Sequence, residues 1–182
     1  TLAAQSAGGG QPLPAPAHGG LQPPRPPVRF VAIGDYGTTT QGSFDVAAQV
    51  LALAPDFVIT LGDNNYPSGS AATIDQNIGQ HYHDFIQPYT GSYGAGSAVN
   101  RFFPTLGNHD WSAPGALPYL NYFQLPYNER YYTFARGPVQ FFVLDSDVRE
   151  PDGILASSLQ GRWLEAALAR SRAPFRVVYL HH

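Results

Sequence analysis

The chain has 182 residues, a net charge of −3 at pH 7 and a calculated isoelectric point near 6.0. With 43% apolar and only 13% charged residues, it has the composition of a globular protein with one core, not that of a disordered chain or of a basic protein that binds nucleic acid. Cysteine is absent, which excludes disulfide scaffolds, thiolate metal sites and cysteine nucleophiles, and no apolar run approaches the ~18 residues that span a membrane.

The first 27 residues predict a tail that precedes the folded domain. They contain seven prolines and five glycines but only three large apolar side chains, too few to offset the entropy lost on ordering. We therefore expect residues 1–27 to be a disordered linker and residues 28–182 to form the domain. The tail and the lack of an initiator methionine at Thr1 are typical of an exported protein after processing, whether secreted, periplasmic or at the cell surface, although an arbitrary boundary would give the same start.

From Val28 onward, short apolar runs alternate with segments of helical periodicity. The apolar runs predict strands at 28–33, 57–61, 102–106, 131–134, 139–144 and 176–180, and the fourth and fifth of these form a hairpin. Apolar residues recur at helical spacing in three segments: Phe44 to Leu51 with Ser43 as N-cap, Ile74 to Phe85, and Trp163 to Leu168. This alternation predicts an α/β fold with a layered β-sheet flanked by helices.

Four of the predicted strands end in clusters of polar residues. The clusters are Gly34-Asp35-Tyr36-Gly37, Gly62-Asp63-Asn64-Asn65-Tyr66, Gly107-Asn108-His109-Asp110 and His181-His182. Taken singly, each is typical of an ordinary turn or strand end. Functional groups in open α/β sheets lie beyond the carboxyl ends of the strands, and together these clusters offer carboxylate, carboxamide and imidazole groups. We therefore interpret them as one metal site.

A pair of metal ions explains why these residue types occur together. Two cations about 3.5–4 Å apart require a carboxylate shared between them. Asp63 is the natural bridge, with Asp35 on one ion and Asn108 and His181 on the other. A hydroxide on such a pair attacks phosphorus while the ions neutralise the phosphoryl oxygens. The pattern predicts metal-dependent hydrolysis of phosphate esters.

Two further residues follow Asn108 directly. His109 adjoins a predicted ligand, so its imidazole could donate a proton to the leaving group or act as an electrostatic clamp on the substrate. Asp110 either orients His109 or caps a helix, and the sequence leaves both interpretations open.

A third acidic segment, Asp145-Ser146-Asp147, follows the predicted strand at 139–144. It resembles a calcium-binding loop only faintly, because the glycine that follows is misplaced and no bidentate glutamate comes after it. We interpret the segment as a turn.

The runs GDYG, GDNNY and GNHD and the final HH, in that order, resemble the motifs of the calcineurin-like metallophosphoesterases. Tyr66, three residues after Asp63, narrows the resemblance to the purple acid phosphatases, whose second motif has the form GDNxY. The stretch before the first motif is short and rich in proline, which makes the chain more similar to the small, tartrate-resistant type than to the large plant type with its extra amino-terminal domain. The resemblance covers residues 28–182.

The resemblance implies a binuclear centre of Fe(III) and a divalent ion, which is Fe, Zn or Mn. Asp35 and Tyr66 would bind the ferric ion, Asp63 would bridge, and Asn108 and His181 would hold the divalent ion. The role of Tyr66 agrees with its chemistry, because a phenol with a pKa of about 10 ionises at neutral pH only beside a strong cation. The implied reaction is the hydrolysis of small phosphomonoesters by a hydroxide on this centre.

Two alternatives stay open. The same site could act as a phosphodiesterase or nucleotidase, or the domain could be a non-catalytic binding module that keeps the fold without the metals. A visible absorption band from iron and tyrosinate would argue against the second alternative.

The sequence departs from the family's pattern at its end. The Gly-His-x-His motif, which would add one ligand to each ion, is absent, and the chain ends on the strand that should carry the motif before it. We choose His181 over His182 as the ligand because the family's pattern at this point is His-x-Pro. We expect a sequence that is truncated at its carboxyl end, and we expect the 182-residue chain alone to be poor in metal and inactive.

Overall fold

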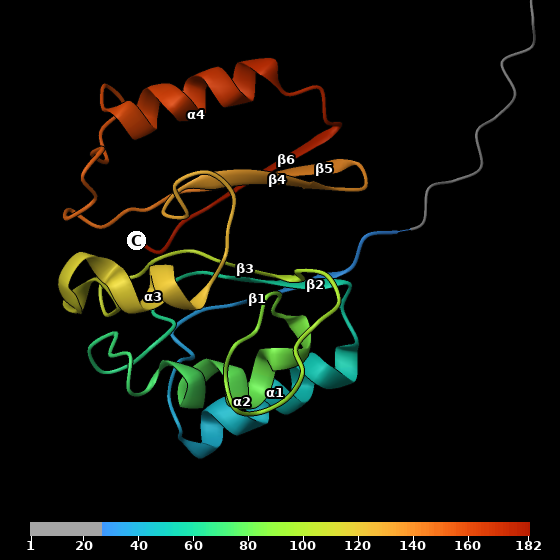
Figure 1. Ribbon diagram of the computed structural model, residues 1–182. Helices are drawn as coiled ribbons and strands as arrows, with labels where there is room; N and C mark the ends of the chain where they lie inside the picture. Colours follow the sequence, from blue (N-terminus) through green and yellow to red (C-terminus); the bar gives the residue numbers. More distant parts are fainter. Residues whose placement is uncertain (1–26) are drawn as a thin grey trace, which may run out of the picture.

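The computed structural model describes residues 27–182, and in it two β-sheets lie face to face (Figure 1). Helices cover the outer face of each sheet, so that the layers follow one another as helix, sheet, sheet and helix. The predicted α/β fold with helices flanking the β-layers is confirmed. The predicted tail, apart from Pro27, lies outside the described residues.

The first sheet contains three parallel strands in the order β1-β2-β3, namely β1 (Phe30–Ile33), β2 (Phe57–Thr60) and β3 (Phe102–Pro104). Val58 of β2 pairs with Val31 on one side and with Phe102 on the other, so β2 is the central strand. Every residue of β2 is buried, as expected for a parallel strand covered on both faces.

The second sheet contains β4 (Tyr132–Arg136), β5 (Val139–Val143) and β6 (Phe175–Tyr179). β4 and β5 form the predicted antiparallel hairpin, and β6 lies parallel to β5. The predicted apolar runs locate all of these strands to within about two residues at each end. They do not reveal that the strands form two sheets, because an apolar run indicates a buried strand but not which strand it pairs with.

Two longer helices connect parallel strands: α1 (Gln41–Leu53) joins β1 to β2, and α4 (Leu159–Arg170) joins β5 to β6. The side chain of Ser158 caps α4 by accepting a hydrogen bond from an amide in its first turn. The predicted cap of α1 is wrong. Ser43 lies inside that helix, where its hydroxyl donates to the Tyr36 carbonyl at 2.9 Å.

The helix predicted at 74–85 is broken in the structure. It consists of a π-helical turn (Asp75–Gly79), α2 (Gln80–Tyr82) and a 3-10 turn (His83–Phe85). The Asp75 carboxylate accepts hydrogen bonds from the hydroxyls of Tyr89 and Tyr122, at 2.7 and 2.8 Å. These contacts join the irregular first turn to distant parts of the chain, and apolar spacing does not encode them.

A short helix, α3 (Leu117–Tyr122), follows two 3-10 turns at Asp110–Ser112 and Pro114–Ala116. The sequence does not predict these elements, because none is long enough to repeat an apolar spacing. The hydroxyl of buried Tyr119 donates to the Pro104 carbonyl at 2.9 Å and so attaches α3 to the end of β3.

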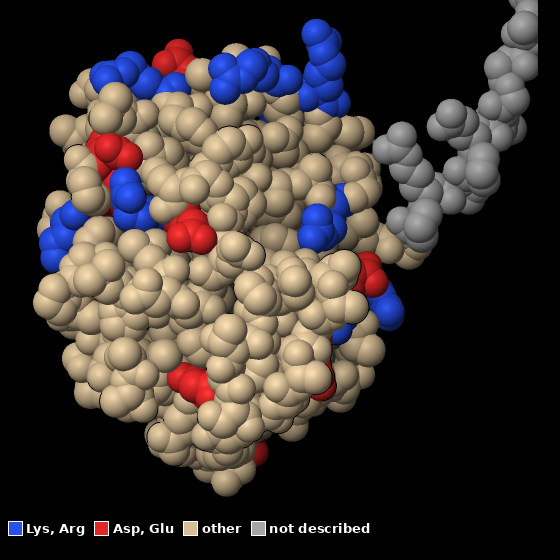
Figure 2. All heavy atoms as spheres, in the orientation of Figure 1, with Lys and Arg blue, Asp and Glu red and all other residues tan. Residues whose placement is uncertain are grey.

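Charged side chains are sparse on the face shown in Figure 2. Arginine side chains gather along the edge formed by α4, which carries Arg162 and Arg170. Among the described residues, no helix is both long and apolar enough to cross a bilayer.

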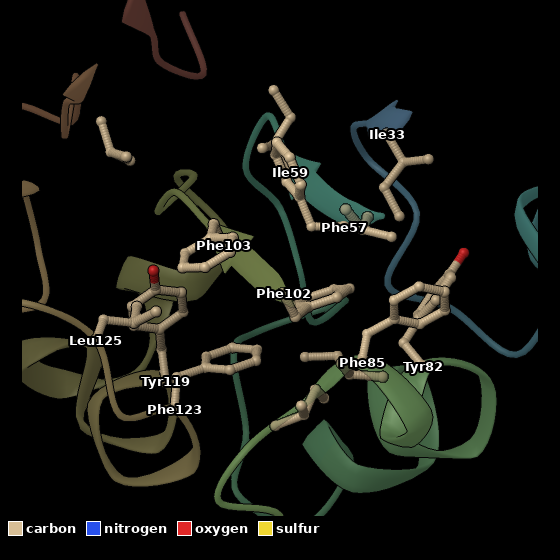
Figure 3. Close-up of a cluster of buried hydrophobic side chains, with 14 of the residues drawn as sticks. Ile33, Phe57, Ile59, Tyr82, Phe85, Phe102, Phe103, Tyr119, Phe123 and Leu125 are labelled. Atoms are coloured by element: carbon tan, nitrogen blue, oxygen red, sulfur yellow. The ribbon is translucent and has the colours of Figure 1, made fainter. Parts of the chain in front are cut away.

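Aromatic side chains form the core on both faces of the first sheet, and Figure 3 shows the part around Phe102, Phe103 and Tyr82. Successive residues of a strand point to opposite faces. The Phe103 ring stacks on Phe134 of the second sheet with centroids 3.9 Å apart, whereas the Phe102 ring lies 5.5 Å from Tyr82 on the helical side. This packing holds the first sheet between the two neighbouring layers.

The carboxyl ends of β1, β2, β3 and β6 lie at one edge of the molecule, where the end of the chain is marked in Figure 1. Backbone hydrogen bonds continue beyond the first sheet, since the Asp35 amide donates to the Gly62 carbonyl at 3.1 Å and the Thr105 amide donates to the Thr60 carbonyl at 3.2 Å. His181 follows β6 at the same edge. The four polar clusters predicted from the sequence therefore meet in space.

Candidate metal centre

Two matching turns place the first two carboxylates. Asp35 and Asp63 each follow a glycine at the end of a strand, and each has a left-handed backbone, with φ of 53° and 52°. Aspartate tolerates this conformation better than most residues do. Because β1 and β2 are neighbours, the two turns direct both carboxylates to the same side of the sheet edge.

The carboxylates meet the imidazole that follows β6. One possible ligand atom from each of Asp35, Asp63 and His181 lies within 4.8 Å of the other two. The Tyr66 hydroxyl joins the same group, because it lies 3.0 Å from Asp35 Oδ1 and 2.7 Å from Asp63 Oδ2 and donates to both. The structure thus brings together the residues predicted for the iron side of the site.

Asn108 and His181 form the other side of the cluster. His181 Nε2 lies 3.2 Å from Asn108 Oδ1 and 3.5 Å from Asp63 Oδ1. His181 Nδ1 lies 2.6 Å from the Leu61 carbonyl, and in the tautomer that donates to this carbonyl Nε2 is a bare acceptor. Nε2 then faces two acceptor oxygens, an arrangement that a cation would stabilise.

His182 lies outside the cluster. Its ring contacts Ser146, with Nδ1 2.8 Å from the serine hydroxyl, and the residue is exposed. Of the two terminal histidines, His181 alone is directed toward Asp63, and it is also the one that the family resemblance implies.

The donor set fits hard or borderline metal ions. Carboxylate, carboxamide and phenol oxygens with one imidazole suit divalent and trivalent cations of this class. In the described part of the chain, neither Asp35 nor Asp63 forms an ion pair with lysine or arginine. Burial, and then the hydrogen bonds to the two carboxylates, raise the pKa of the Tyr66 phenol far above its usual range. The phenol proton lies where three oxygens converge, and a metal ion in this place would take over its role.

The imidazole of His109 lies beside the Asp63 carboxylate but forms no hydrogen bond with it. The backbone amide of His109 donates to Asp63 Oδ1 at 2.8 Å, while its Nε2 lies 4.0 Å from Asp63 Oδ2. The ring lies against that of Tyr66, with centroids 4.3 Å apart, and about a third of the side chain, 35%, is exposed. Nδ1 lies 2.6 Å from the Pro67 carbonyl, so this carbonyl fixes the ring orientation.

Asp110 neither orients His109 nor caps a helix. Its Oδ2 accepts hydrogen bonds from the Gly107 amide and from Asn64 Nδ2, both at 2.9 Å, so it ties two loops of the site to each other. Burial raises the pKa of Asp110 to about 6. Both interpretations that the sequence leaves open for Asp110 are therefore wrong, because its carboxylate is directed inward, away from the imidazole.

Two glycines let the loops approach this closely. A side chain at Gly62, which has φ of 90°, would place its Cβ 2.6 Å from the His181 ring. A Cβ at Gly107 would overlap the backbone and carboxylate of Asp63. Both positions need glycine for the cluster to close.

Two asparagines, Asn64 and Asn65, support the site in roles that the motifs themselves do not indicate. Asn64 is buried beside Asp110, as described above. Asn65 is also buried, and its Oδ1 accepts a hydrogen bond from Asn77 Nδ2 at 2.8 Å, while Asn77 also donates to the Tyr66 carbonyl at 2.9 Å. The sequence feature that could have predicted these roles is the Asn64-Asn65 pair, because two adjacent asparagines that follow a buried strand need hydrogen-bond partners.

Residues 28–182 match the family described as calcineurin-like phosphoesterase. The chain is 35% identical over 91 residues to purple acid phosphatase 17 of Arabidopsis thaliana, a match that covers 46% of this chain and 24% of the relative. It is 32% identical over 82 residues to tartrate-resistant acid phosphatase type 5 of Mus musculus, which covers 40% of this chain and 24% of that protein. The matches thus span about a quarter of the length of these relatives.

The fold is also similar to a solved structure, that of purple acid phosphatase PPD1 from yellow lupin (Lupinus luteus) seeds. The two superpose with a TM-score of 0.65 over 85% of this chain and 30% of the lupin chain. At 19% sequence identity, this likeness concerns the fold alone.

Proposed function

The chain belongs to the calcineurin-like phosphoesterase family, and we propose on that premise that its polar cluster is the active site of a metal-dependent acid phosphatase. The substrate class is small phosphomonoesters. The observation that carries the proposal is the convergence of Asp35, Asp63 and His181, whose ligand atoms lie within 4.8 Å of one another, with Tyr66 and Asn108 in direct contact.

The family implies a binuclear metal centre, and the donor set supports one assignment of its ligands. Asp35 and Tyr66 would hold one ion, Asn108 and His181 the other, and Asp63 would bridge them. A phenolate favours iron in the ferric state, which leaves Fe, Zn or Mn in the divalent state for the second position. Such a pair supplies Lewis acidity and a nucleophile at neutral pH.

The protein's own groups prepare the reaction. The backbone amide of His109 holds Asp63 Oδ1 at 2.8 Å and so fixes the carboxylate between the two halves of the site. With Nδ1 directed at the Pro67 carbonyl, the Nε2 atom of His109 is the one that exchanges a proton. The side chain is about a third exposed beside the cluster, and in the protonated ring Nε2 would donate a proton to the leaving oxygen of the ester.

An activity assay of the intact protein tests the proposal. The metal content is measured first, and hydrolysis of p-nitrophenyl phosphate is then followed between about pH 4 and pH 7. Asp63→Asn should abolish turnover, whereas Asp45→Asn, a change of the same kind on the exposed side of α1, should leave it unchanged. A fully metallated protein with no phosphatase activity would overturn the proposal. Parallel assays with bis(p-nitrophenyl) phosphate measure any diesterase activity.

The metal assignment has its own test. Iron bound through Tyr66 should give a visible charge-transfer band, and Tyr66→Phe should remove this band while the ring keeps its packing against His109. A band that persists in Tyr66→Phe would contradict the assignment of Tyr66 as the iron ligand.

A further inference from the structure

The segment 145–149, which follows β5, lies against the loop that carries Asn108. The indole Nε1 of Trp111 donates to Asp145 Oδ2 at 2.7 Å, and the Asp147 amide donates to Asp145 Oδ1 at 2.9 Å. Asp145 and Asp147 are both buried, although they follow a strand in a region that the sequence marks only as a turn. Asp145 therefore has a structural partner, Trp111, in the loop that carries Asn108.

Arg149 makes the most direct connection to that loop. Its Nη2 donates to the Asn108 carbonyl at 2.9 Å, and its Nη1 donates to the Trp111 carbonyl at 3.0 Å. The guanidinium thus spans the turn from 108 to 111 and binds the main chain of the predicted ligand itself.

Asp147 holds this guanidinium in place. Its two carboxylate oxygens accept from Nε and Nη2 of Arg149, each at 2.7 Å, and its side chain is only 4% exposed. Four of the five N–H groups of the guanidinium are therefore used, two on the carboxylate and two on the carbonyls. A lysine has a single charged nitrogen and cannot hold all of these acceptors in one plane.

The same segment also contacts the chain next to the imidazole ligand. The hydroxyl of Ser146 accepts a hydrogen bond from the His182 amide at 3.0 Å, one residue beyond His181. Segment 145–149 therefore binds the main chain at or beside both Asn108 and His181, whose side chains approach each other to 3.2 Å. Among the described contacts, it makes none with Asp35 or Tyr66.

We propose that Arg149, held by Asp147, is a positioning residue that sets the metal affinity of the Asn108 and His181 half of the centre. It acts through the Asn108 carbonyl, which fixes the loop so that Oδ1 faces His181 Nε2. The inference rests on the proposed metal site, and it adds a residue outside the motifs to that site. Residues that orient metal ligands typically change affinity by 10–100-fold when they are removed.

Zinc titration of the metal-free intact protein is the test. Calorimetry of the wild type should reveal two bound Zn²⁺ ions. Asn108→Ala should weaken the ion on the Asn108 side and Tyr66→Phe the ion on the Tyr66 side, so these two variants assign each binding event to one half of the site. In Arg149→Met the Zn²⁺ ion on the Asn108 side should bind about 10–100-fold more weakly, and the affinity for the ion on the Tyr66 side should be unchanged. Arg149→Lys should recover little of the loss. Arg162→Met removes the same charge from the exposed side of α4 and should change the affinity for neither ion.

A double-mutant cycle separates this role from a general loss of structure. If Arg149 acts through Asn108, Arg149→Met should add little further loss in the Asn108→Ala background. Asp147→Asn should weaken the binding of the same ion to a smaller extent, because the guanidinium keeps its charge and loses its fixed orientation. Circular dichroism and thermal unfolding establish that each variant is folded.

The outcomes are distinguishable. A wild-type protein that binds no Zn²⁺ would overturn the proposed metal site itself. Zn²⁺ binding by the wild type with unchanged affinity in Arg149→Met would overturn the role of Arg149 alone. The role of Arg149 would also be overturned if Asp147→Asn weakened the binding of both Zn²⁺ ions equally, or if the two losses in the double-mutant cycle were fully additive.

Discussion

The two halves of the candidate site are held by different means. The half with Asp35 and Tyr66 relies on its own loops, since Asn77 reaches Asn65 across only 12 residues of sequence. The half with Asn108 and His181 relies on distant parts of the chain. Arg149 lies 41 residues from Asn108, and the Leu61 carbonyl that His181 contacts lies 120 residues away.

This difference shows what short motifs can and cannot encode. The first half forms once two neighbouring strands end in matching turns, so a few consecutive residues specify most of it. The second half forms only when the second sheet is packed against the first, because its imidazole and its supporting arginine both come from the second sheet's side. The second half should therefore be the more sensitive to changes far from the site.

Asp63 belongs to both halves, and its substitution should have the largest effect. Asp63→Asn keeps the shape of the side chain but removes the charge that both sides share. We expect the bound metal to be lost from both halves and kcat/KM to fall by more than about 100-fold. This loss exceeds the one typical of a residue that only orients a metal ligand. Elemental analysis and steady-state kinetics measure the two effects. Loss of only one ion would show that Asp63 is not the bridge.

Gly107→Ala should open the second half. The added Cβ would overlap Asp63, so the loop with Asn108 must move away from Asp63. We expect a loss of stability of about 1–3 kcal/mol, typical of overpacking, with weaker binding of the ion on the Asn108 side.

Gly42→Ala on exposed α1 is the matched control, because a Cβ there meets nothing closer than 3.9 Å. This change should stabilise the protein by up to about 1 kcal/mol. Thermal unfolding of both variants checks the pair, and equal shifts would contradict the close approach at Gly107.

Asn77→Ala should affect the first half alone. It removes the amide that binds both the Asn65 side chain and the Tyr66 carbonyl in a buried setting. We expect about 1–3 kcal/mol of lost stability from the unpaired acceptors, together with weaker metal binding on the Tyr66 side. Asn121→Ala on the exposed side of α3 is the control and should change neither. Urea unfolding and metal titration provide the readouts, and weakening on the Asn108 side instead would be inconsistent with a separate first half.

Asp145 should give an effect that is visible only through the pH dependence of stability. Burial raises the pKa of its carboxyl from 3.8 to about 7. Between these values the folded state keeps a proton that the unfolded state has released, so stability is greatest below the lower value and falls as the pH rises through the window. The slope is at most about 1.4 kcal/mol per pH unit. Asp145→Asn should lack this contribution, and urea unfolding across the window measures it. Parallel pH profiles for the two proteins would refute it.

The sequence predicts the strands and the convergence of the site well, for physical reasons that concern single residues. Val58 and its neighbours form an unbroken apolar run because both faces of β2 are covered. Asp35, Asp63 and Asn108 follow directly after such runs, so the topology of parallel strands brings them to one edge.

Features set by tertiary contacts escape the sequence. Ser43 has the right type and place for a helix cap, yet its hydroxyl binds the Tyr36 carbonyl instead. Asp110 is adjacent to His109 but is directed inward to Asn64. Arg149 belongs to no recognisable motif. Its partners in the Asn108 loop are main-chain carbonyls, which every residue has, so they leave no pattern of residue types in the sequence. Position along the chain indicates where a loop starts but not where its side chains point.

The glycine–aspartate turns at the ends of β1 and β2 also affect the distance between the carboxylates of Asp35 and Asp63. Adjacent strands of any sheet are held about 4.8 Å apart by their backbone hydrogen bonds. Asp35 and Asp63 follow two such neighbours with the same left-handed backbone, and Asp63 lies one residue further along its strand, so the spacing of the strands sets the scale of the separation between the two acids. Grafting the same dipeptide onto strands one place further apart would double the interval and leave each acid to act alone.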